Sequence, residues 1–97
     1  MNLDLRNKNA LVGGSSKGIG KATAQELAAL GANVTLMARS AELLQEVMND
    51  LDTSQGQQHD FIIVDFTDIA DLQAKAQALT EQKTIHILVN NTGGPPG

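Results

Sequence analysis

Apolar residues in this chain gather in short continuous runs, which are separated by longer stretches of helical periodicity. The runs occupy residues 8–12, 33–38, 61–64 and 85–90. Each is too short for a typical helix and is bounded by polar residues or glycine, as buried strands are. Between the runs, apolar residues recur at steps of three and four, which is typical of amphipathic helices. The pattern therefore predicts strands and helices in alternation.

Three helices are expected between the four strands. The first begins near Gly18, and its predicted apolar face comprises Ile19, Ala22, Leu27 and Leu30, with Gly31 beyond its end. The second has Ser40 as its N-cap and an inward face of Leu43, Leu44, Val47, Met48 and Leu51. The third is capped by Thr67 or Asp68 and extends to about Gln82, with Ile69, Leu72, Ala76 and Leu79 inward.

Strands that are apolar on both faces are typical of a parallel sheet covered by helices, so the predicted fold class is doubly wound α/β. Right-handed crossovers give the strand order 3-2-1-4 and place the third helix alone on its face. The fourth strand is then an apolar edge, and such edges invite pairing with another chain. We therefore expect self-association, or a complementing carboxyl-terminal segment, at the fourth strand. Residues 1–97 are interpreted as the amino-terminal half of one larger domain.

Composition narrows the functional classes. The chain has 97 residues, a formal net charge of −4, no cysteine and only two aromatic residues, both Phe. The negative charge argues against nucleic acid as a partner. No apolar run approaches the roughly 20 residues that span a bilayer, and the amino terminus does not resemble a signal peptide. We expect a cytoplasmic protein that has no membrane partner and no metal site.

A glycine-rich stretch, GGSSKGIG at residues 13–20, follows the first strand and opens the first helix. Glycines permit positive φ angles and let a ligand approach the main chain closely. The free N–H groups at the start of the helix favour an anion there. A plain turn would also use glycines, but the strand–loop–helix context predicts a dinucleotide phosphate site.

The glycine spacing, with Gly14, Gly18 and Gly20, is G-x-x-x-G-x-G. In this spacing the chain resembles the short-chain dehydrogenase/reductase family, which has T-G-x-x-x-G-I-G at this turn; Gly13 replaces the threonine. Residues 65–68 (DFTD) resemble the D-x-T-D segment of the family. Residues 90–93 (NNTG) resemble its N-N-A-G segment, with Thr92 in place of alanine.

The resemblance implies a Rossmann-type fold with an adenine pocket lined by Asp65 and its neighbour Phe66. The implied cofactor-binding residues are Gly14, Ser15, Ser16, Lys17, Gly18, Ile19, Gly20, Arg39, Ser40, Asp65, Phe66, Asn91, Thr92 and Gly93. About 20 positions beyond the glycines, NAD-binding proteins carry an acidic residue, but Arg39 stands there. A guanidinium fits a 2′-phosphate, and Lys17 can add a second positive charge, so we expect NADP(H) as the cofactor.

The resemblance also implies hydride transfer, for which the family uses a Tyr-x-x-x-Lys pair. This chain contains no tyrosine, and no catalytic residue is predicted within it. One interpretation is the NADP(H)-binding segment of a short-chain oxidoreductase, similar to 3-oxoacyl-[acyl-carrier-protein] reductases. The alternative is a non-catalytic nucleotide-binding or assembly module that is complete at residue 97.

Overall fold

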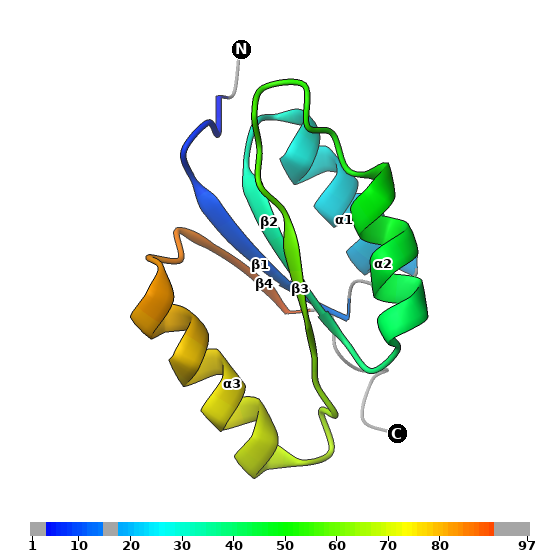
Figure 1. Ribbon diagram of the computed structural model, residues 1–97, viewed down its shortest axis with the longest axis vertical. Coiled ribbons are helices and arrows are strands. Elements are labelled where there is room, and N and C mark those ends of the chain that lie inside the picture. The colour runs from blue at the N-terminus through cyan, green and yellow to red at the C-terminus, as the bar shows by residue number, and fades with distance from the viewer. Residues whose placement is uncertain (1–3, 15–17, 91–97) are drawn as a thin grey trace.

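The computed structural model describes residues 4–14 and 18–90, which form one parallel sheet with helices on both faces (Figure 1). The elements are β1 (Asn9–Gly13), α1 (Gly18–Ala29), β2 (Asn33–Ala38), α2 (Ala41–Asp50), β3 (Asp60–Ile63), α3 (Ile69–Gln82) and β4 (Ile87–Asn90). The strand order is β3-β2-β1-β4, and every pairing is parallel. The predicted fold class and strand order are confirmed.

The two faces of the sheet are covered unequally. Helices α1 and α2 lie on one face, and α3 lies alone on the other (Figure 1). Of the described residues, eleven are buried in the core on the α1/α2 side, among them Val12, Val34 and Leu36. The core under α3 contains, within residues 4–14 and 18–90, only Leu11, Met37, Val64 and Leu79. The α3 face is therefore thinly covered, as the sequence predicted.

Helix α1 contacts the sheet through small residues. Its buried positions are Gly20, Ala24 and Ala28, which follow one another at steps of four along a single ridge. The predicted apolar face is wrong at Ile19, which is 74% exposed, and at Ala22, which is also exposed. Small side chains let the helix approach the sheet closely, and this packing excludes the bulkier isoleucine. A prediction based on hydrophobicity alone misses this preference.

Both helix caps predicted from sequence are present. The Ser40 Oγ accepts a hydrogen bond from the Leu43 N–H at 3.3 Å at the start of α2. Of the two alternatives for α3, Asp68 is the cap, and its carboxylate accepts from the Asp71 N–H at 3.1 Å. These bonds satisfy main-chain donors that the first turn of a helix leaves free. Ile69 in the first turn of α3 is 64% exposed and Leu43 on α2 is 39% exposed, so the predicted inward position of each is wrong.

The outer strands differ from their predicted form. The third strand was expected to be a buried run over residues 61–64, but β3 covers Asp60–Ile63 and Ile63 is 44% exposed. β3 is an edge strand, so its apolar side chains are partly open to solvent, although Phe61 packs against the α1/α2 core and Ile62 against the cluster under α3. β4 begins at Ile87, two residues later than predicted. The central strand β2 has the predicted bounds.

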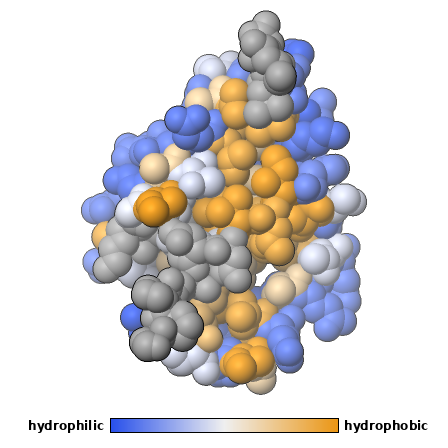
Figure 2. Space-filling model, turned by 180° about the vertical axis from the view of Figure 1, so that it is seen from behind, coloured by the Kyte–Doolittle hydropathy of each residue, from blue (hydrophilic) through white to orange (hydrophobic). Residues whose placement is uncertain are grey.

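An apolar groove of about 530 Å³ lies between α3 and the sheet. Leu11, Met37, Leu72 and Leu88 contribute to its lining, and Leu88 on the edge strand β4 is 70% exposed. Figure 2 shows a band of hydrophobic residues on the side of the molecule where β4 lies. Within the part of the chain that the structure describes, no helix is long and apolar enough to cross a membrane.

Candidate cofactor site

The parallel register brings the segments that follow β1, β2 and β3 to one edge of the sheet. Gly13 pairs with Met37, which in turn pairs with Ile62. The Gly14 N–H donates to the Met37 carbonyl at 2.8 Å, extending the ladder into the glycine turn. β4 reaches the same edge, because Asn90 pairs with Gly13. Open α/β sheets bind ligands at this edge, outside the carboxyl ends of their strands.

The glycine turn has the backbone geometry expected from its sequence. Gly14 has φ +70° and Gly18 has φ +64°, so both lie in the left-handed region that favours glycine. Gly20 is buried in the first turn of α1. The predicted ligands Ser15, Ser16 and Lys17 lie outside the described residues. The exposed Ile19 side chain flanks the turn and is accessible to a bound ligand.

Arg39 and Ser40 follow β2 but differ in availability. Arg39 is exposed, and its guanidinium makes no hydrogen bond or ion pair within the described ranges. The Ser40 hydroxyl already caps α2, so its role in the structure is to begin that helix. Arg39 is therefore the side chain of this pair that is available to an anionic ligand.

Asp65 is held in place by the residue two positions further along the chain. Its Oδ1 accepts from the Thr67 N–H at 2.9 Å and from the Thr67 hydroxyl at 2.7 Å. These two bonds, with a smaller contribution from the positive charge of Arg39, lower the pKa of the Asp65 carboxyl below its ordinary value. The ionised carboxylate is therefore favoured. Its Oδ2 has no hydrogen-bond partner among the described residues and can accept from a ligand.

Phe66 faces the core more than the site. Its side chain is half-buried, packs against the cluster under α3 and lines the apolar groove. The contribution of Phe66 to an adenine pocket stays a prediction. Asn91, Thr92 and Gly93 lie outside the described residues, so their assigned role stays a prediction.

Sequence reasoning missed two residues that support this edge. Thr67 orients the Asp65 carboxylate, and the i to i+2 spacing of Asp and Thr is a recognisable signal for such a turn. Lys75, on α3, donates from Nζ to the Ile63 carbonyl and lies 3.3 Å from the Asp71 carboxylate. Lys75 thus ties α3 to the end of β3, a contact between distant residues that no local pattern reveals.

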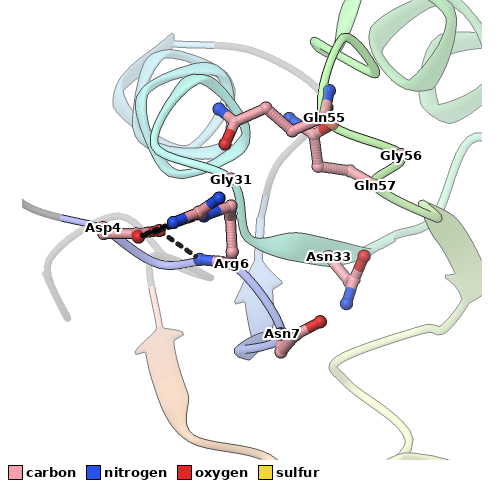
Figure 3. A pocket seen from close by; sticks show the side chains of 8 residues that line it. All are labelled: Asp4, Arg6, Asn7, Gly31, Asn33, Gln55, Gly56 and Gln57. Carbon is pink, nitrogen blue, oxygen red and sulfur yellow. Dashed lines mark hydrogen bonds and ion pairs between the residues drawn. The ribbon is translucent and has the colours of Figure 1, made fainter.

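A polar pocket of about 260 Å³ lies at the opposite edge of the sheet (Figure 3). Its polar groups are largely satisfied within the protein. Arg6 pairs with Asp4 at 2.7 Å, and the buried Gln57 amide donates to the Ala28 carbonyl and accepts from the Gln55 N–H, both at 2.7 Å. The Gln57 bond joins the loop before β3 to the end of α1, and the Leu5 N–H, which donates to the Leu30 carbonyl at 2.8 Å, joins the amino-terminal segment to the same end. The pocket is therefore a structural junction.

Metal chemistry has no support from side-chain clustering. Among residues 4–14 and 18–90, no group of three or more His, Cys, Asp or Glu side chains could hold a metal ion. The candidate site consists instead of a glycine turn, an available guanidinium and an oriented carboxylate. This set suits a ligand that carries phosphates and hydrogen-bond donors.

Comparison with known proteins identifies the class. Residues 8–97 match the family model for short chain dehydrogenases, and this chain belongs to that family. The chain is 38% identical over 84 residues to the human inactive hydroxysteroid dehydrogenase-like protein 1, covering 87% of this chain and 26% of the relative. It is 42% identical over 97 residues to an uncharacterized oxidoreductase of Schizosaccharomyces pombe, covering 96% of this chain and 29% of the relative.

A solved structure supports the same conclusion. The L-sorbose reductase from Gluconobacter frateurii, complexed with NADPH and L-sorbose, has a TM-score of 0.85 and 31% sequence identity to this chain. The match covers 99% of this chain and 37% of the reductase. This chain spans less than a third of the two curated relatives, so it corresponds to only part of proteins of this kind.

Proposed function

We propose that this chain binds NADP(H) at the carboxyl edge of its sheet, as the cofactor-binding part of a short-chain oxidoreductase. The observation that carries the proposal is the position of Arg39. It follows β2, next to the glycine turn, and its exposed guanidinium is free of partners among the described residues. A planar guanidinium binds a phosphate through two parallel hydrogen bonds, which a ribose hydroxyl cannot offer.

The other residues of the site are assigned complementary tasks. The main chain of the glycine turn and the amino end of α1 hold the pyrophosphate. The free Oδ2 of Asp65 accepts a hydrogen bond from the adenine amine, while its Oδ1 stays bound to Thr67. A bound nicotinamide supplies or accepts a hydride, and in the whole protein a carbonyl or alcohol carbon is its partner. The NADPH bound to the L-sorbose reductase supports this choice of cofactor.

The cofactor preference can be tested by calorimetry with NADP⁺ and NAD⁺ on the 97-residue chain. In the Arg39→Gln variant, affinity for NADP⁺ should fall by about tenfold or more, because a charge-assisted hydrogen bond contributes about 1.5–3 kcal/mol. Affinity for NAD⁺ should stay within about twofold. Lys8→Gln removes one positive charge at the opposite edge and is the matched control. Equal loss of both nucleotides in Arg39→Gln would contradict the assignment.

A second candidate function is nucleotide binding without catalysis. It is favoured by the human relative, whose name describes it as inactive. The oxidoreductase and the non-catalytic module predict the same nucleotide affinities, so only a measurement of catalytic turnover separates them. Oxidation of NADPH with a β-ketoacyl or quinone substrate, by a longer protein that contains this segment, supports the oxidoreductase. Tight NADPH binding by that protein with no turnover on any carbonyl substrate supports the binding module.

We further propose that the open edge of β4 is a pairing surface. Its outer main-chain groups, which pair with no strand among the described residues, and the exposed Leu88 form an apolar edge beside the groove under α3. A second copy of this chain would pair there, or a further segment would add another strand. The oligomeric state in solution distinguishes these two occupants.

A further inference from the structure

The candidate site holds a negative charge close to the positive charge that would bind a 2′-phosphate. Ala38 and Ile63 are partners in the β2–β3 ladder, and the Val64 N–H donates to the Ala38 carbonyl at 2.9 Å. Arg39 therefore leaves β2 at the level where Val64 leads into Asp65. Both Arg39 and Asp65 are exposed, and they share the same edge of the sheet.

The Asp65 carboxylate cannot easily turn away from this position. Thr67 donates two hydrogen bonds to its Oδ1, and the Asp68 N–H donates to the Asp65 carbonyl at 3.0 Å. The same bonds to Oδ1 favour the ionised form of the carboxyl. The site thus contains a fixed anion beside an exposed cation that has no partner among the described residues.

We propose that Asp65 restrains the preference for a 2′-phosphate that Arg39 creates, and so acts as a specificity-determining residue of the site. The carboxylate attracts the Arg39 guanidinium when no ligand is bound, and it repels a phosphate dianion once one binds. Both the competition for Arg39 and the repulsion weaken binding of the 2′-phosphate, and they weaken binding of a nucleotide without this phosphate less. This inference rests on the proposed NADP(H) function.

The test compares 2′,5′-ADP with 5′-AMP, which differ only in the 2′-phosphate, by calorimetry on the 97-residue chain at about 0.15 M salt. Both probes carry the adenine ring, so any loss of an adenine contact in Asp65→Asn weakens both and cancels in the ratio of their dissociation constants. The amide oxygen introduced by this substitution can still accept from Thr67. We expect the preference for 2′,5′-ADP to rise by about fivefold, the effect of one unit charge on a nearby dianion in water. The increase should shrink in high salt.

Asp60→Asn is the matched control, because it removes the same charge from the amino end of β3. Asp65 lies five positions further along the chain, in the extended direction of β3, which is roughly 16 Å and about two Debye lengths at physiological salt. The Asp60→Asn variant should therefore prefer 2′,5′-ADP as strongly as the unmodified chain does. If Arg39→Gln abolishes the preference for 2′,5′-ADP but Asp65→Asn leaves it unchanged or reduces it, the inference about Asp65 is overturned and the proposed NADP(H) function stands. Absence of any preference in the unmodified chain, or of nucleotide binding, overturns the proposed function and this inference with it.

Discussion

His86 and Asn9 are joined by two hydrogen bonds at the start of neighbouring strands. The Asn9 N–H donates to the imidazole Nδ1 of His86 at 3.0 Å, and the His86 N–H donates to the Asn9 carbonyl at 2.9 Å. The Asn9 side-chain amide adds a bond to the Thr84 carbonyl at 2.9 Å. The residue before β4 is therefore fixed against β1, although 77 positions separate the two in sequence.

Removal of the His86 acceptor should loosen the edge strand. His86→Leu leaves the Asn9 N–H without this partner, and we expect a loss of about 1 kcal/mol in the free energy of unfolding. His86→Asn is the matched variant, because its Oδ1 can take the position of Nδ1 and should retain most of the stability. Urea unfolding followed by circular dichroism measures both. Equal stabilities of the two variants would show that the acceptor contributes nothing.

Gly31 and Gly56 offer a comparison of steric and conformational costs. Gly31 has φ +105°, and a Cβ there would lie 2.8 Å from the Arg6 Cγ and 3.1 Å from the Arg6 main-chain nitrogen. Gly56 has φ +82° with no atom within 4 Å of a Cβ. Gly31→Ala should therefore lower the free energy of unfolding by about 2–4 kcal/mol, and Gly56→Ala by about 1–2 kcal/mol. Thermal unfolding of both variants tests the order, and a smaller loss at Gly31 would refute the steric argument.

The sequence predicted the elements well because local patterns determine them. The continuous apolar run of β2, the Ser40 cap and the positive φ of Gly31 all follow from a few adjacent residues. Packing partners were harder to predict. Periodicity assigned Ile19 to the inward face of α1, whereas Ala24 and Ala28 occupy it, because close approach to the sheet favours small side chains.

The candidate site was predicted at the level of segments, and its internal contacts were not. Strand order alone brings Arg39 and Asp65 to one edge, so the sequence could place them together. The commitment of Asp65 Oδ1 to Thr67, and the bond from Lys75 to the Ile63 carbonyl, depend on three-dimensional positions that periodicity does not encode. The inward packing of Phe66 likewise depends on where α3 lies over the sheet.

The ionisation of Asp65 should respond to Thr67. Thr67→Val removes the hydroxyl donor but keeps the N–H donor, so the pKa of the Asp65 carboxyl should rise towards its ordinary value. Thr67→Ser keeps both donors and should leave the pKa low. Carboxyl carbon chemical shifts, recorded by NMR across a pH titration, report the pKa directly. A low pKa in Thr67→Val would assign the effect to the N–H donor and Arg39.

The hydrogen bond from the Thr67 hydroxyl to Asp65 also predicts how the stability of the fold changes with pH. Because folding lowers the pKa of Asp65, its contribution to stability is fully present above the unfolded-state value and is lost as the pH falls through the folded-state value. Thr67→Val should therefore be less stable than the unmodified chain at neutral pH. The part of this difference that comes from the charged carboxylate should disappear in strong acid. A difference that does not vary with pH would assign the whole effect to packing.

The open edge of β4 leads to a prediction about assembly. Leu88 is 70% exposed on this edge strand, and the groove beside it is apolar along Leu11, Met37 and Leu72. If a second copy covers this edge, the 97-residue chain should dimerise at concentrations of about 100 μM, and Leu88→Lys should yield a monomer because an edge lysine opposes strand pairing. Leu43→Lys introduces the same charge at an exposed position on α2 and should leave the dimer intact. Light scattering after size-exclusion chromatography measures the masses. A monomeric unmodified chain would exclude the second copy at this concentration and favour a further segment as the occupant of the edge.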